Sequence, residues 1–237
     1  MLIVPAGLAA VALALHGTGL DRHLTDQFFD ASSRVFSLRS NALLELIGHG
    51  MARSAAVLVW SCIFAGALGS LKLAELRPYR RILWLTATAM ALGPIVVVVL
   101  KEVTSFPCPW NLRQYGGFAG EPDAWFVSPA NAGRCFPAGH AAGGFSFVAF
   151  YFAAVAMQRR RLALVALVCA LAAGTAFGFV RVVQGAHFLS HAVWAAAIDW
   201  LMAALVFAPS LFGHWHQQSP LTPRLQGDGP EGPGAMR

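Results

Sequence analysis

The sequence predicts an all-α integral membrane protein built as a bundle of about six transmembrane helices. Of its 237 residues, 57% are hydrophobic and only 12% are charged, whereas an average soluble domain has roughly 25% charged residues. The apolar residues are also grouped into runs close to the roughly 20 residues that are needed to cross a hydrocarbon core. These runs cover residues 2–16, 54–71, 82–100, 140–157, 162–180 and 190–208.

The first run, residues 2–16, is short and is either a retained helix or a signal peptide. It lacks a basic n-region and a convincing small-residue cleavage site, which favours a retained helix. The following segment, residues 17–53, carries aspartates among aromatic residues, a pattern typical of one or two amphipathic helices in the membrane interface.

Basic residues in short loops indicate the orientation, because such loops stay in the cytoplasm. One cluster lies between the second and third runs, at Lys72, Arg77, Arg80 and Arg81, and another between the fourth and fifth, at Arg159, Arg160 and Arg161. By alternation, both termini are cytoplasmic, and residues 17–53, 101–139 and 181–189 face the opposite side. The net charge of +6 is explained by this anchoring and by anionic headgroups, so no nucleic-acid partner is expected.

We expect one membrane-embedded domain over residues 1–208, followed by a C-terminal tail over residues 209–237. The tail is rich in Gly and Pro, and such a composition predicts disorder. No repeat of fixed period is present, and nothing indicates the oligomeric state.

The four cysteines have two different environments. Cys62 and Cys169 fall inside apolar runs, where packing explains them, whereas Cys108 and Cys135 bracket one extracytoplasmic loop. In an oxidising compartment the second pair would form a disulfide that closes a loop of 28 residues. On the chain-entropy model such a bond stabilises the protein by about 3 to 4 kcal/mol.

Ionisable residues gather where the apolar runs end. Arg181, His187 and His191 lie between the last two runs, and Lys101 ends the third run. Ionisable groups in such places are functional candidates by default. Imidazoles can attack or transfer protons near neutral pH, and guanidinium groups bind phosphate. The topology places all of them on one membrane face, which predicts a basic site for phosphate chemistry.

The fourth run opens on Pro137-Ala138-Gly139-His140, preceded by Arg134. Free backbone N–H groups at such a helix start attract anions, so a phosphate there would have His140 beside it. We find no CxxC pair, P-loop or GxGxxG pattern. The sequence therefore predicts neither a cofactor nor a metal site.

These stretches resemble the three motifs of the type-2 phosphatidic acid phosphatase superfamily. Its Lys-x6-Arg-Pro motif corresponds to Lys101 through Cys108-Pro109, and its Pro-Ser-Gly-His motif to residues 137–140. Its Ser-Arg-x5-His-x3-Asp motif corresponds to residues 180–191. The resemblance covers residues 50–205 and is greatest to the bacterial membrane branch that includes the lipid A 1-diphosphate synthase.

The resemblance implies a role for each matching residue. His187 would be the nucleophile that forms a phosphohistidine, and His140 would be the acid that protonates the departing oxygen. Lys101 and Arg181 would hold the phosphoryl oxygens, assisted by the amide of Gly139. Such a transition state needs mainly positioning and charge neutralisation.

Three positions depart from the family pattern. Cys108 replaces a phosphate-binding arginine, Ala138 replaces a hydroxyl donor, and His191 replaces the aspartate that orients the nucleophile. Arg134 is the nearest cation that would substitute for the missing arginine. A neutral His191 would accept the N–H of His187, as a weaker orienter than a carboxylate. Alternatively, Asp199 hydrogen-bonds to His191 in a relay or pairs with a helix neighbour inside the membrane.

The expected function is that of a phosphatase or phosphotransferase acting on phosphorylated lipids, such as polyprenyl diphosphates, lipid A or phosphatidate-like lipids. The resemblance implies the bacterial inner membrane, with the site facing the periplasm. Because three motif positions are altered, the alternative is a membrane protein that binds lipid phosphate without turnover. A transporter is disfavoured, since paired broken helices and inverted repeats are missing.

Overall fold

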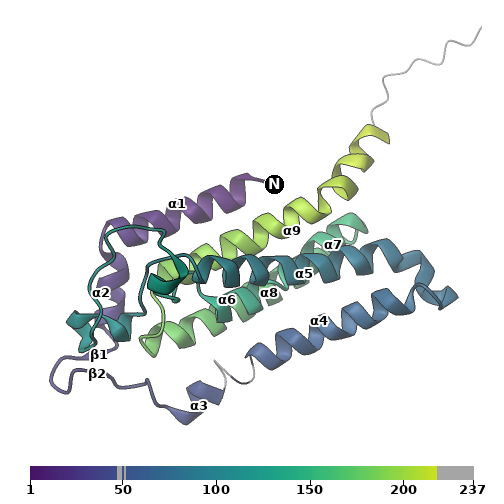
Figure 1. Ribbon diagram of the computed structural model, residues 1–237. Coiled ribbons are helices and arrows are strands. Elements are labelled where there is room, and N and C mark those ends of the chain that lie inside the picture. The colour runs from purple at the N-terminus through teal and green to yellow at the C-terminus, as the bar shows by residue number, and fades with distance from the viewer. Residues whose placement is uncertain (47–49, 51, 218–237) are drawn as a thin grey trace, which may run out of the picture.

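The computed structural model describes residues 1–46, 50 and 52–217 and is mostly helical (Figure 1). The helices are α1 (Ile3–Gly17), α2 (Leu20–Asp26), α3 (Ala42–Glu45), α4 (Ala52–Gly69), α5 (Arg80–Lys101), α6 (Gly139–Phe145), α7 (Val148–Ala156), α8 (Arg160–Val183) and α9 (Leu189–Gln217). Short 3-10 helices occupy Ala74–Tyr79, Pro109–Asn111, Arg113–Tyr115 and Pro129–Asn131.

Four stretches are long and apolar enough to cross a membrane, which makes the protein a multi-pass membrane protein. They are Ala74–Lys101, Gly139–Ala156, Arg160–Val183 and Leu189–Leu211. Helices α1 and α2 together would form a fifth span, bent by 67°. The predicted run at residues 54–71 corresponds to α4, whose part Arg53–Gly69 is apolar but shorter. The described residues thus give four or five spans by length and composition.

The predicted helix at residues 140–157 is interrupted, so that it forms α6 and α7. At the break, the Ser146 hydroxyl donates to the carbonyl oxygen of Gly143 at 2.8 Å. A serine side chain that bonds back to the preceding turn competes with regular helix geometry. The two pieces still lie within one candidate span.

Helix α9 lies centrally in the bundle, with α1 and α5 packed along it, while α8 packs against α6 and α7 (Figure 1). One core cluster joins α5, α6 and α9 next to the helix ends that carry the residues of the predicted site. Its buried members are Val97, Ala138, Ala141, Ala142, Ala192 and Ala195. Small side chains at these positions let the three helices approach closely.

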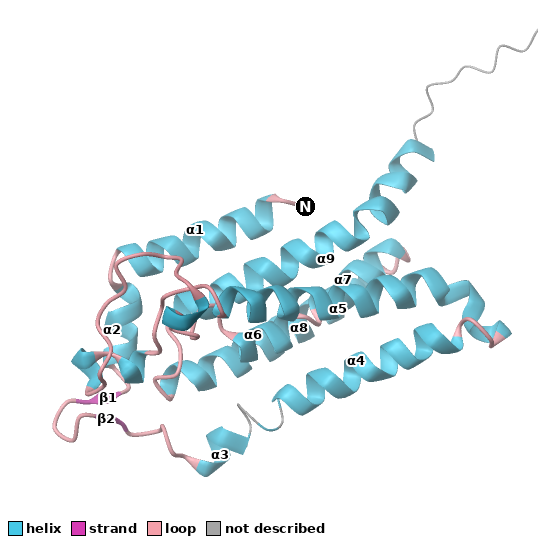
Figure 2. Cartoon of the chain, viewed as in Figure 1, coloured by secondary structure: helices cyan, strands magenta, loops and turns pink. Residues whose placement is uncertain are grey.

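The long loops gather at one end of the bundle, together with a small hairpin that the sequence did not predict (Figure 2). In this hairpin β1 (Phe29–Asp30) pairs antiparallel with β2 (Val35–Phe36). The Tyr115 hydroxyl donates to Asp26 Oδ1 at 2.7 Å, which ties the loop after α5 to α2. The N–H of Trp110 donates to the Gly185 carbonyl at 3.0 Å and ties the same loop to the α8–α9 turn.

The C-terminal boundary differs from the predicted one. Helix α9 runs through Pro209 to Gln217, so residues 209–217 of the predicted tail are helical. The candidate span extends through Pro209 to Leu211, and an internal proline is tolerated in helices of membrane proteins. Residues 218–237 lie outside the described residues.

Candidate active site

The start of α6 brings Gly139 and His140 beside the end of α5. Ala138 is the N-cap residue of α6, and its N–H donates to the carbonyl oxygen of His191 at 3.1 Å. This bond fastens the second motif to the third. A Cβ built on Gly139 would lie 3.9 Å from Nζ of Lys101. The ammonium group therefore stands next to the α6 N-terminus, where free N–H groups favour an anion.

Arg181 lies in the last turn of α8 and is 8% exposed. Its Nη1 donates to Oε1 of Gln184 at 2.9 Å, one helical turn further along the chain. Its guanidinium carbon also lies 5.6 Å from the centre of the Trp110 ring. These contacts hold the guanidinium at the same end of the bundle as Lys101.

His187 follows the turn at Gly185, between α8 and α9. Gly185 has a φ of +72°, and a Cβ at this position would overlap the ring of Phe36. Only glycine fits this turn without strain. The turn buries His187, which is 4% exposed.

The pKa of His187 lies well below its ordinary value of 6.5, first because of burial and then because of electrostatic interactions with neighbouring ionisable groups. Those groups, in order of their effect, are His191, Lys101, His140 and Arg181. The four residues of the predicted reaction therefore converge with His191 on one buried site. Because both burial and these charges disfavour the imidazolium, His187 is neutral at pH 7 and its lone pair is available for attack.

A disulfide between Cys108 and Cys135 lies against His187. The two Cα atoms are 5.1 Å apart. The sulfur of Cys135 lies 2.8 Å from the carbonyl oxygen of Ala186 and 3.4 Å from Nδ1 of His187. The disulfide thus joins the first motif, at Cys108, to the segment before the second motif. The sulfur of Cys135 makes a non-covalent contact with His187 of the third motif.

Cys135, His187 and His191 are also close enough to resemble a metal site, since their ligand atoms lie within 4.8 Å of one another. Metal binding by cysteine requires a thiolate, whereas the sulfur of Cys135 is bonded to Cys108. Two imidazoles remain, one fewer than the three protein ligands of a typical catalytic zinc site. The arrangement fits a histidine nucleophile better than a metal centre.

His191 lies in the first turn of α9 and is 1% exposed. Its ring is hydrogen-bonded to the backbone of Cys135, and its Nδ1 has no partner among the described residues. The ring centres of His187 and His191 are 5.8 Å apart. The observed contact of Nδ1 of His187 is with the sulfur of Cys135 at 3.4 Å, and His191 stands at the position of the family's aspartate.

Asp199 lies two turns further along α9 and is 1% exposed. Eight residues of helix separate it from His191, about 12 Å at 1.5 Å per residue, so the two side chains do not meet directly. Within the described residues, neither carboxyl oxygen has a hydrogen-bond partner. The carboxyl group occupies the space that a side chain at Gly93 of α5 would fill, so its observed role is packing between α5 and α9.

Arg134 lies at the exposed rim of the site. Its Nη2 is 3.3 Å from Oε2 of Glu102, and the two side chains are 63% and 51% exposed. Arg134 is not one of the groups whose charge acts on His187. Its exposure and its pairing with Glu102 set Arg134 apart from the groups that interact with His187.

We therefore expect Arg134→Ala to lower kcat/KM by less than about fivefold, because exposed ion pairs contribute about 0.2–1 kcal/mol and 1.4 kcal/mol is tenfold. Lys101→Met should lower kcat/KM by about 100-fold or more, since it removes the ammonium donor beside the N-terminus of α6. Steady-state kinetics on the purified variants measures both. Equal losses in the two variants would make Arg134 a phosphate ligand.

Three residues of this site had no motif to reveal them. Oδ1 of Asp21 in α2 accepts the N–H of Ser190 at 2.9 Å and caps the start of α9. A carboxylate at a helix N-terminus is stabilising. Gln184 and Glu45 both contact Arg181. Gln184 follows Arg181 by three residues, and this spacing in a helix predicts a contact between the two side chains. Glu45 lies 136 residues before Arg181 in the sequence, so no local pattern indicates their contact.

The chain matches known proteins over the region that contains this site. The family model of the PAP2 superfamily matches residues 82–211. A lipid A 4'-phosphatase from Francisella tularensis subsp. novicida is 27% identical over 193 residues, which make up 80% of this chain and 85% of that protein. No solved structure matches the chain. The family match includes Lys101, His140, Arg181 and His187, and the chain belongs to the PAP2 superfamily.

Proposed function

We propose that the protein removes or transfers the phosphate of a phosphorylated membrane lipid through a phosphohistidine at His187. The observation that carries this proposal is that the buried His187 interacts with Lys101, His140 and Arg181 at the ends of apolar helices. A lipid whose tails stay in the bilayer would present its headgroup at such helix ends. The similarity to a lipid A 4'-phosphatase supports a phosphorylated lipid of the lipid A type as the substrate.

The first step forms a bond between His187 and phosphorus. Nδ1 of His187 faces the sulfur of Cys135, which leaves the lone pair of Nε2 for the attack. As the Nε2–P bond forms, the P–O bond to the lipid breaks, and His140 gives its proton to the departing oxygen. Lys101 and Arg181 neutralise the charge on the phosphoryl oxygens, where fixed donors stabilise the transition state.

The second step releases the enzyme. Water, or the hydroxyl group of a lipid acceptor, attacks the phosphorus of the phosphohistidine and gives its proton to His140. The N–P bond breaks, and His187 returns to its neutral form. The two outcomes are hydrolysis and transfer, and exclusion of water from the site favours transfer.

In the membrane, we propose six spans, with α4 and the α1–α2 pair completing the four long ones. The clusters of basic residues at 72–81 and 159–161 support a cytoplasmic location for those loops, and hence an active site at the outer face of the bacterial inner membrane. The disulfide between Cys108 and Cys135 supports this orientation, because disulfides persist in oxidising compartments.

Phosphate release from three lipid classes tests the proposal. The purified protein in detergent would be given a bisphosphorylated lipid A, a polyprenyl diphosphate and phosphatidate, with and without vanadate. We expect vanadate-sensitive release from at least one of them, or the appearance of its phosphate on an added lipid acceptor. Binding of all three lipids without release or transfer would instead support the non-catalytic alternative, in which the altered motif positions abolish turnover.

A further inference from the structure

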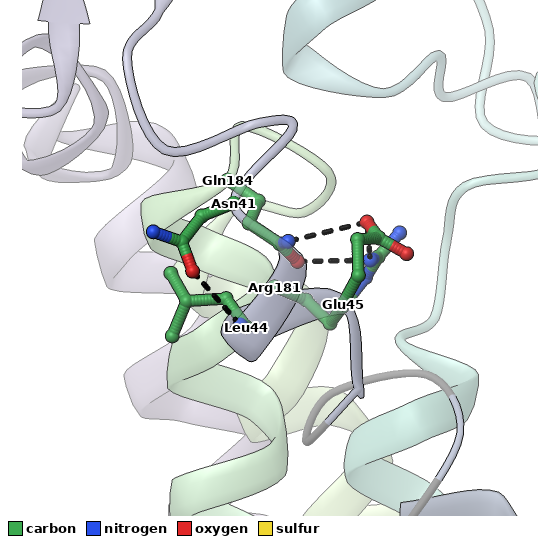
Figure 3. Close-up of polar contacts among 5 residues, drawn as sticks. All are labelled: Asn41, Leu44, Glu45, Arg181 and Gln184. Carbon is green, nitrogen blue, oxygen red and sulfur yellow. Dashed lines mark hydrogen bonds and ion pairs between the residues drawn. The ribbon is translucent and has the colours of Figure 1, made fainter.

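Glu45, which no motif includes, reaches into the phosphate site from α3. Oε1 of Glu45 lies 3.3 Å from Nη1 of Arg181 and 3.2 Å from Nε2 of Gln184 (Figure 3). Helix α3 is held by Asn41, whose Oδ1 accepts the N–H of Leu44 at 3.1 Å. This cap fixes the short turn that presents Glu45 to α8.

A guanidinium and a carboxamide thus converge on a single anionic oxygen. Gln184 connects the two charged groups, since its Oε1 accepts from Arg181 at 2.9 Å while its Nε2 donates to Glu45. Donors of this kind form strong, charge-assisted bonds with the oxygens of carboxylate and phosphate alike. The position of Oε1 is therefore one that a phosphoryl oxygen of a substrate bound to Arg181 would take.

The three partners differ in how easily they move. Gln184 is fully buried and Arg181 is 8% exposed, so both are held by the protein around them. The side chain of Glu45 is 45% exposed and is the member that can leave. A phosphate that approached Arg181 with Glu45 in place would also be repelled by its carboxylate.

We propose that the Glu45 carboxylate is an internal competitor of phosphate, which occupies an oxygen position at Arg181 in the empty site and is displaced by the substrate. The proposal rests on the role of Arg181 in the proposed function. This competition favours lipid phosphates over free phosphate, because free phosphate must displace Glu45 by its own charge alone. A lipid phosphate has the additional binding of its tails to the bilayer and to the protein.

Glu45→Gln tests this proposal, since it removes the charge and keeps the shape of the side chain. Binding of inorganic phosphate and vanadate to the full-length protein in detergent would be measured by isothermal titration calorimetry at constant ionic strength. We expect the dissociation constants to fall by about three- to tenfold, as expected for the loss of one partly screened like charge. A dissociation constant that stays the same or rises would overturn the proposal and make Glu45 a bystander or a support for Arg181.

Glu121→Gln is the matched control. Glu121 pairs with Arg22 at 2.9 Å, and its side chain is 51% exposed, so this substitution also removes a carboxylate from a half-exposed ion pair. It should leave phosphate binding unchanged. Because the measurement needs no turnover, tighter phosphate binding by the Glu45 variant would stand even if no lipid were hydrolysed. The failure of the proposed function and the failure of this inference are thereby distinguishable.

Discussion

His187→Gln is expected to abolish turnover, with a loss of at least about 10⁴-fold in kcat, because the reaction would lose its nucleophile. Glutamine keeps a polar side chain of similar reach but has no lone pair that forms a phosphorylated intermediate. The lipid should still bind, since Lys101 and Arg181 are untouched. Phosphate release and lipid binding, measured on the same preparation, separate these two effects.

His23→Gln provides the control for this substitution. His23 lies in α2 at the same end of the bundle but is exposed, and its replacement should leave kcat unchanged. A His187→Gln protein that kept more than about a tenth of the activity would show that phosphorus is attacked by another group, such as a water molecule.

Removal of the disulfide between Cys108 and Cys135 is expected to have the second large effect. Reduction by a dithiol transfers two electrons and two protons to the cysteines, and the dithiol becomes a disulfide. The 28-residue loop is then no longer closed, which costs about 3 to 4 kcal/mol on the chain-entropy model. The sulfur that contacts Nδ1 of His187 also loses its fixed position.

We therefore expect a lower unfolding midpoint and, at temperatures where the reduced protein remains folded, a fall in kcat of about tenfold or more. Loss of the group that orients a catalytic histidine has a larger effect in other enzymes, but sulfur is a weak acceptor. The double variant Cys62→Ala/Cys169→Ala, which lacks only the free cysteines, should remain sensitive to the dithiol. Full activity of the folded, reduced protein would show that the disulfide does not support His187.

The composition of the chain is sufficient to predict its long apolar helices, because lipid imposes a length and an apolar character that few other structures share. The predicted run at residues 82–100 lies within α5, and that at 162–180 lies within α8. The positions where a long helix is interrupted are harder to predict, because they depend on individual side-chain hydrogen bonds. The break between α6 and α7 depends on where one hydroxyl group, that of Ser146, finds its acceptor.

The convergence of Lys101, His140, Arg181 and His187 was predictable because all four stand at helix ends on one side of the bundle. Contacts made by the irregular segments were not. Glu45 lies in a helix of only four residues, and nothing in its local sequence indicates that it meets Arg181. The acceptor next to His187 was also missed, because the family pattern directed attention to His191.

The most direct test of the central claim is to identify the residue that carries phosphate during turnover. The enzyme would be mixed with excess lipid substrate, quenched in alkali to preserve a phosphohistidine, digested and analysed by mass spectrometry. We expect one phosphorylated peptide, with the phosphate on His187, and its loss in the His187→Gln variant. Phosphate on another residue, or steady turnover with unmodified His187 at every quench time, would contradict it.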